Sequence, residues 1–448
     1  MSLLCALLSV VRLQLPRVQM RCTLVLAIGV TFSLSAAAQF DGWFDGSPEH
    51  PSINYADRPV KDPVAALNRK VQEGTVELKF DTSQGYLRSV LKALNVPIES
   101  QIVVFSKTSV QASRISRSNP RTLFFNDSVV IGWVHGGFME LAAQDPQQGV
   151  IFYTLDQSIT GYQERTMKLP IFSLFKRQND CLTCHISYAT LGVPGMLVRS
   201  ALPGSDDFPI RRLGDYVIDH RSPFEERWGG WYVTGRSGSV RHLGNIILTN
   251  PEAPASSISS ETLQTLMGKF DTNQYLSPYS DIAALLVFDH QMRMNNLLTR
   301  VSWEARYGAD EHRIERTAHI RDAVNELVDY LLFIDEAPLP NSIEGTSGFS
   351  EKFAAQGPYD GKGRSLRQLD LKRRLMRYPC SYMIYTEAFD SLPEEVRDAI
   401  FHRMWQILSG QEAGQKYTRL TLSDREAVVD ILRETKHGLP VYFKSLTH

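Results

Sequence analysis

The hydrophobic pattern changes once along the chain, and this change most constrains the fold. Between residues 101 and 155, short runs of β-branched and aromatic residues are separated by turn signals rich in Gly, Asn and Asp. Such runs are typical of neighbouring strands in an antiparallel sheet. From about residue 258 the apolar residues recur with the period of helices instead. The sequence therefore predicts an α+β fold, with a mostly antiparallel sheet in the N-terminal region and helices in the C-terminal region.

The individual elements are predicted from the same patterns. Strands are expected within residues 74–80, 101–107, 121–126, 128–134, 137–143 and 149–155. Helices are expected within residues 63–73, 83–96, 281–308, 314–335, 392–410 and 422–438. In the last helix Ser423 is the expected N-cap, because Glu426 follows three residues later.

Composition and pattern together divide the chain into four stretches. Residues 1–38 predict a signal peptide, and residues 39–157 predict the N-terminal α+β region. Residues 158–257 are rich in Gly, Pro and Arg and predict a binding segment with little regular structure. Residues 258–448 predict the helical region.

The first stretch has the layout of a secretory signal. Three arginines precede an apolar run at residues 23–38, and the run ends in small residues. Cleavage is expected after Ala38, which predicts export to the periplasm. Met1 and Met20 are both candidate start residues, and a membrane anchor is the alternative interpretation of the apolar run.

Charge and hydropathy exclude two classes of partner. The 448-residue chain has a formal net charge of −1, whereas binding to nucleic acid phosphates requires a basic excess. No segment after the signal is long and apolar enough to cross a bilayer. We therefore expect no nucleic acid partner and no transmembrane segment in the mature chain.

Two of the three cysteines that follow the signal form a haem-attachment motif. Cys181, Cys184 and His185 have the spacing C-x-x-C-H, which attaches c-type haem. Two thiols one helical turn apart reach two vinyl groups of the porphyrin, and the adjacent histidine binds the iron as the proximal ligand. A thioredoxin-type dithiol would require a βαβ setting, and a zinc site would require two more ligands. We therefore expect one covalent haem c, with Cys380 as a buried core thiol.

The residues after the motif resemble the same region of c-type cytochromes. There, a Gly-Pro-x-Leu-like stretch packs beside the proximal histidine, and residues 192–197 of this chain read Gly-Val-Pro-Gly-Met-Leu. The resemblance implies that Pro194 supports His185 and that Met196 lies on the proximal side. It covers about twenty residues, with a changed residue order. The whole chain resembles exported bacterial single-haem proteins with a cytochrome c domain, and that resemblance implies no particular reaction.

The sixth iron ligand has several candidates in the sequence. His242 is the first, because glycines and aromatic residues that suit close packing on a porphyrin precede it. His290 is the second, with Met294 one turn further along the same predicted helix. His220 lies beside an aspartate that can orient its ring. For each of these residues, a place in the core or on the surface is the alternative.

Arginines near the motif are candidate partners of the haem propionates, because guanidinium groups bind carboxylates through paired hydrogen bonds. Solubility is the alternative role for each of them. They are Arg211, Arg212, Arg221, Arg227, Arg236 and Arg241.

The expected function is electron transfer by a periplasmic c-type cytochrome to a redox partner protein or a respiratory chain component. A haem-dependent oxidoreductase of peroxidase-like character, with an open sixth coordination position, is the alternative, and a haem-based sensor is a third class. The length of the chain favours the oxidoreductase, since a carrier needs only about a hundred residues. The single motif disfavours it, because exported cytochrome-like peroxidases usually carry a second haem.

Overall fold

The structure is a computed structural model that describes residues 42–158, 174–250, 260, 263–311, 314–444 and 446. Contacts divide the chain into two units, Met1–Trp43 and Phe44–His448. The predicted signal peptide lies outside the described residues. All elements named below belong to the second unit.

A seven-stranded antiparallel sheet forms the N-terminal part of this unit, in the order β6-β5-β4-β3-β2-β1-β9. Strands β2 to β5 follow one another as a meander, whereas β9 comes from far along the chain and pairs with β1. A separate hairpin pairs β7 with β8. The strands are β1 Ile102–Val104, β2 Arg121–Phe125, β3 Val129–Trp133, β4 Met139–Asp145, β5 Gly149–Leu155, β6 Lys176–Arg177, β7 Val198–Ser200, β8 Tyr216–Ile218 and β9 Trp231–Tyr232.

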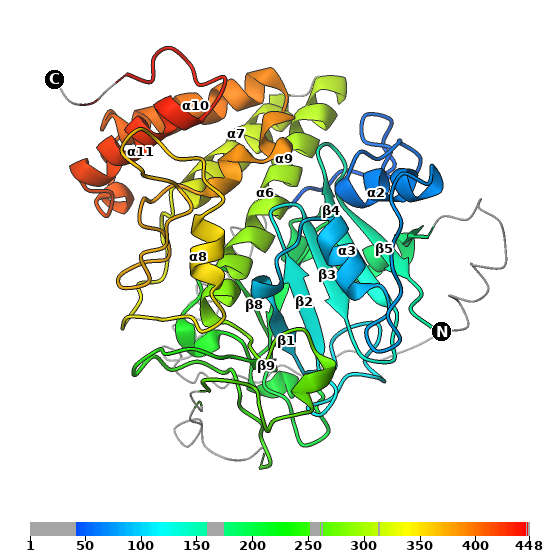
Figure 1. Cartoon of the computed structure of the whole chain (residues 1–448). Helices are drawn as coiled ribbons and strands as arrows, with labels where there is room; N and C mark the ends of the chain where they lie inside the picture. The colour runs from blue at the N-terminus through cyan, green and yellow to red at the C-terminus, as the bar shows by residue number, and fades with distance from the viewer. Residues whose placement is uncertain are drawn as a thin grey trace, which may run out of the picture. The chain divides into compact units, whose positions relative to one another are not determined.

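Both faces of this sheet are covered, which explains why its strands are apolar almost throughout. One face, with Phe124 and Ile131, packs against helices α2 and α3. The other face, with Leu123 and Val130, packs against α6. Figure 1 shows α6 between the sheet and the C-terminal helices.

The helices confirm the predicted change of pattern. α6 is buried on all sides over most of its length, although it also carries buried polar side chains such as Asp289, Asn296 and Arg300. α7 packs along α6, α10 packs on α7, and α11 packs on α10. The helices are α2 Pro63–Gln72, α3 Leu87–Ala93, α5 Leu182–His185, α6 Ile282–Glu311, α7 Ile314–Leu331, α8 Phe349–Ala354, α9 Glu387–Asp390, α10 Glu394–Leu408 and α11 Leu422–Thr435.

Some boundaries differ from the predicted ones for local reasons. Residues 74–80 are not a strand, and the Lys79 N–H donates to Ser89 Oγ instead of to a neighbouring strand. α3 begins after Gly85, whose φ of 61° does not continue a helix. α7 ends before Phe333 and Asp335, which both have positive φ.

The N-terminus of α11 is capped two residues earlier than predicted. Thr421, not Ser423, is the N-cap, and its hydroxyl accepts from the Asp424 N–H. Asp424 rather than Glu426 completes the reciprocal bond to the Thr421 N–H. The helical region also begins later than residue 258, because residues 263–281 form turns and a short 3₁₀ helix before α6.

The N-terminus of α6 is tied to a distant loop by one buried carboxylate. Asp281 Oδ1 accepts from the Ala283 N–H at 2.8 Å. Its Oδ2 accepts from the backbone N–H groups of Thr346 and Ser347, at 2.8 and 2.7 Å, and from the Ser347 hydroxyl. The side chain therefore caps the central helix and holds the loop that precedes α8.

We expect Asp281→Ala to lower the free energy of unfolding by about 3 kcal/mol, because it removes a helix cap and leaves buried donors without an acceptor. Urea denaturation followed by circular dichroism measures this loss. The control is Asp322→Ala, which removes an exposed carboxylate from the neighbouring helix α7 and should change stability by less than about 0.5 kcal/mol. Equal losses in the two variants would contradict the role given to Asp281.

Candidate functional site

The predicted motif lies at the edge of the sheet, beside a large pocket. The pocket has a volume of about 2020 Å³, about twice the upper end of the usual range of ligand sites, ~300–1,000 Å³. Ala142 and Phe152 line it from the face of the sheet that packs on α6, and Leu141 and Tyr153 line it from the other face. The pocket therefore borders both faces of the sheet.

Cys181, Cys184 and His185 all line this pocket. They follow strand β6 on a 3₁₀ turn that leads directly into the short helix α5. Cys184 is exposed and Cys181 is partly buried, and no disulfide joins them. The sequence expectation that these three residues act together is thus consistent with the local geometry.

The imidazole of His185 is held by a backbone carbonyl. Its Nδ1 lies 2.8 Å from the Gly195 carbonyl oxygen, and since a carbonyl can only accept, Nδ1 carries the proton and donates. Nε2 then keeps its lone pair. Burial lowers the pKa of His185, which favours the neutral ring. Histidines that bind metals usually have this arrangement, with one ring nitrogen donating to a carbonyl and the other free to bind.

Asn296 on α6 fixes the loop that carries this carbonyl. Its Oδ1 accepts from the Met196 N–H at 3.0 Å, and its Nδ2 donates to the Met196 carbonyl at 2.7 Å. A Cβ at Gly195 would lie 2.2 Å from Asn296 Oδ1, so only glycine fits there. Met196 lines the pocket, and the Pro194 carbonyl accepts from the Val150 N–H on β5.

An apolar wall faces the motif from the sheet and from α6. The Phe152 ring lies 4.6 Å from the His185 ring, centroid to centroid. The wall continues over neighbouring strands and ends at Phe288 of α6 and Trp231 of β9. Its members are Val104, Leu123, Val130, Ala142, Phe152, Trp231 and Phe288.

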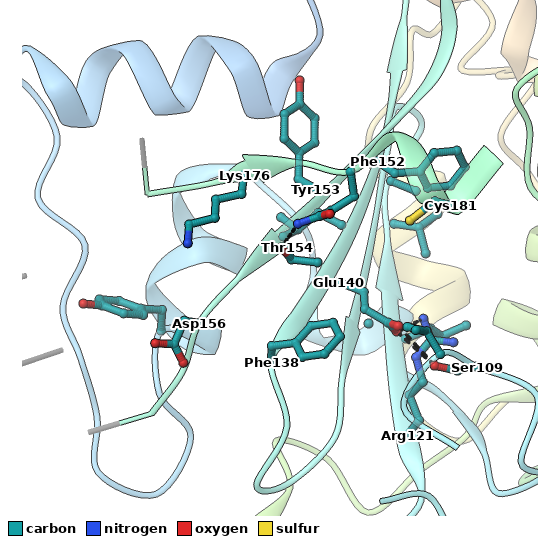
Figure 2. Close-up of a pocket in the computed structure, with 18 of the residues that line it drawn as sticks. Ser109, Arg121, Phe138, Glu140, Phe152, Tyr153, Thr154, Asp156, Lys176 and Cys181 are labelled. Carbon is teal, nitrogen blue, oxygen red and sulfur yellow. Dashed lines mark hydrogen bonds and ion pairs between the residues drawn. The ribbon is translucent and has the colours of Figure 1, made fainter. Parts of the chain in front are cut away.

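An ion pair, Arg121 with Glu140, also lines the pocket. Figure 2 shows both residues together with Ser109. Arg121 on β2 forms an ion pair with Glu140 on β4, and the Ser109 hydroxyl donates to Glu140 Oε1 at 3.1 Å. The two strands are not neighbours, because β3 runs between them. The guanidinium crosses β3 above Gly132, where a Cβ would lie 2.6 Å from Arg121 Nη2.

The candidate sixth ligands are held away from the pocket. His290 is fully buried, with Nδ1 2.7 Å from His220 Nδ1 and Nε2 2.7 Å from Ser381 Oγ. His242 is buried against Trp228, and its Nδ1 accepts from the Gly244 N–H. None of these histidines lines the pocket that His185 lines, and neither does Met294, which lies in the core.

The arginines near the motif in the sequence are also absent from the pocket lining. None of the six predicted propionate partners lines it, whereas Arg121 and Arg199 do. Arg121 precedes the motif by sixty residues and reaches it only through the pairing of strands. The sequence did not indicate Asn296, Arg121 or Glu140 as site residues, because no motif surrounds them. Among the described residues, no three His, Cys, Asp or Glu side chains form a metal-binding group.

We expect Gly132→Ala to lower the free energy of unfolding by about 1–3 kcal/mol, because the added methyl group displaces the Arg121 guanidinium from Glu140. Chemical denaturation measures this loss. In the background of Arg121→Gln, the same change should cost less than about 1 kcal/mol, since the clash is then removed. An equal cost in both backgrounds would show that Arg121 does not cross β3 at Gly132.

Comparison with known proteins finds no matching family model, no matching curated protein and no matching solved structure. In the part of the chain that the structure describes, no helix has both the length and the apolar character needed to span a membrane.

Proposed function

We propose that this chain carries one haem c, attached through thioethers to Cys181 and Cys184, with His185 as the axial iron ligand. The observation that carries the proposal is the His185 ring, whose Nδ1 donates to the Gly195 carbonyl beside a pocket that both cysteines line. Haem iron binds a neutral histidine ring, in which one nitrogen donates a hydrogen bond and the other has a lone pair for the metal.

The lining of the pocket, like the motif itself, is suitable for a porphyrin. The apolar wall covers one part of the site, and Arg121 and Arg199, each in an ion pair with a carboxylate, lie at its polar part. When bound, haem c supplies one-electron chemistry and, with a free sixth position, binding of a small ligand. Asn296 would keep His185 oriented by fixing the Met196 backbone.

The geometry favours a haem-dependent oxidoreductase over a simple carrier. A carrier needs a second side chain on the iron, but His242 and His290 both engage other groups outside the pocket. The volume of the pocket also exceeds that of most single-ligand sites. We infer that the reactant enters this pocket and meets Arg121 and Glu140.

Electron transfer to a partner protein is the second candidate function, and it rests on the exposure of residues in and next to the motif. Cys184 is exposed, and Tyr188 three residues after His185 is 59% exposed. This puts one side of the motif within reach of a docked protein. Either function fits a protein exported to the periplasm, because covalent haem attachment takes place outside the bacterial cytoplasm.

We expect the exported protein to retain haem after denaturing electrophoresis, detected by haem staining. Cys181→Ala combined with Cys184→Ala should abolish the stain, because no thioether remains. The matched control is Cys380→Ala, which removes a buried thiol far from the motif in sequence and should leave the stain intact. Extraction of haem from the wild type into acidic organic solvent would refute covalent attachment.

We expect the ferric protein to be high-spin and the reduced protein to bind carbon monoxide rapidly, because no candidate histidine faces the pocket. Absorption spectra and stopped-flow mixing measure both properties. His242→Ala and His290→Ala should leave the spectrum unchanged where the protein still folds. A low-spin wild type that is inert to carbon monoxide would instead support the electron carrier.

A further inference from the structure

A fully buried arginine lies between the loop before β9 and helix α6. Arg227 is 2% exposed, and it donates through Nε and Nη2 to the Ser222 carbonyl and through Nη2 to the His220 carbonyl. Its Nη1 lies 3.5 Å from Asp289 Oδ2. Neutral carbonyls satisfy most of its donors, so the balance of its positive charge depends on carboxyl groups nearby.

Two buried carboxyl groups flank this cation, and one of them has an oxygen without a hydrogen-bond partner. Asp289 is 0% exposed; its Oδ2 accepts from Trp228 Nε1 at 3.0 Å, and its Oδ1 has no partner. Glu336 is 5% exposed, and its Oε1 accepts from the Leu375 N–H. Arg227, Glu336 and His220 line a cavity of about 10 Å³, and His220 Nε2 has no partner either.

The cluster has one buried cation, Arg227, for two buried carboxyl groups. One cation balances one carboxylate, so the second carboxylate would be a buried, uncompensated charge, which is costly. Burial raises the pKa of Asp289 to about 7 and that of Glu336 to about 7. Burial also lowers the pKa of His290 to about 3, so the histidines bring no positive charge.

Two further arginines act on Glu336. Arg374 is paired with Asp424, and Arg419, which donates to the Glu336 carbonyl, is exposed, so solvent screens its charge. Asp219 and Arg221 form their own ion pair at 2.6 Å, and burial raises the pKa of Tyr330, which keeps it neutral. The charged and titratable groups that face Arg227, Asp289 and Glu336 from the surrounding loops and helices are Asp219, His220, Arg221, His290, Tyr330, Arg374 and Arg419.

The cluster adjoins the wall of the large pocket. Asp289 directly follows Phe288, which lines the pocket. Trp228, which donates to Asp289, belongs to the same turn as Trp231, another pocket residue. Asp289 is thus next to a pocket residue in the sequence of α6, and in the buried interior Coulomb interactions with charge in the pocket are weakly screened.

We propose that Arg227, Asp289 and Glu336 form a proton-binding site that takes up one proton from solvent when an electron donor, a redox partner protein or a chemical reductant, reduces the haem. This rests on the proposed haem c. An added electron makes the pocket more negative, so the second carboxyl group binds a proton more tightly. Reoxidation releases the proton.

Redox titration of the purified protein between pH 6 and 8 tests this coupling. We expect the reduction potential to fall as pH rises, with a limiting slope of ~59 mV per pH unit for one proton per electron. Reduction in weakly buffered solution should also take up protons, as measured with a pH indicator. A wild-type potential independent of pH over this range would overturn the proposal.

Two variants locate the proton. Asp289→Asn and Glu336→Gln each leave a single carboxylate to balance Arg227, so each should flatten the slope. The control is Glu326→Gln. Glu326 lies on α7 and forms ion pairs with Arg293 and Arg300 of α6, so this variant should keep the wild-type slope. A slope retained in both Asp289→Asn and Glu336→Gln would assign the proton elsewhere.

A measurement that needs no haem separates this proposal from the proposed function. Both folded carboxyl groups have a pKa raised above the value of an unfolded chain, ~4, so the folded state binds more protons between about pH 4 and 7. Stability should therefore fall as pH rises through this window, and less so in Asp289→Asn. An identical pH dependence in the variant overturns the proton site, whereas absent haem staining overturns only the haem.

Discussion

The hydrogen bonds between Asn296 and the backbone of Met196 connect the two halves of this molecule. Asn296 belongs to the buried helix α6, whereas Met196 belongs to the loop that orients His185. Through this contact the position of one imidazole depends on a helix more than a hundred residues further along the chain. The packing of α6 against the sheet and α7 thus fixes the geometry of a short, partly exposed motif.

Much of the fold could be predicted because buried elements require apolar residues in a recognisable pattern. The strands that form the meander are mostly apolar runs bounded by turns, and α6 begins with an unbroken apolar run from Ile282 to Phe288. Residues 74–80 show how such an apolar pattern can predict a strand that does not form. Their alternating pattern with Val76, Leu78 and Phe80 reflects partial packing against the core, not pairing with another strand.

The candidate site could be predicted only where chemistry fixes the spacing. Cys181, Cys184 and His185 lie within five residues, so the sequence alone indicates them. Arg121 and Glu140 meet by crossing a third strand at a glycine, and strand register carries no signal in local composition. His242 was a reasonable candidate beside glycines and aromatic residues, but those residues pack its ring into the core.

The pairing of β9 with β1 has a consequence for the order of assembly. Val103 pairs with Tyr232, so the segment with Cys181, Cys184 and His185 lies inside the long chain loop that this pair closes. During synthesis, the β1–β9 edge of the sheet cannot be completed until this segment has already emerged. Closing such a loop late costs chain entropy and slows folding. Cys181 and Cys184 follow β6 at the opposite edge of the sheet, so both have emerged before the β1–β9 pair can close.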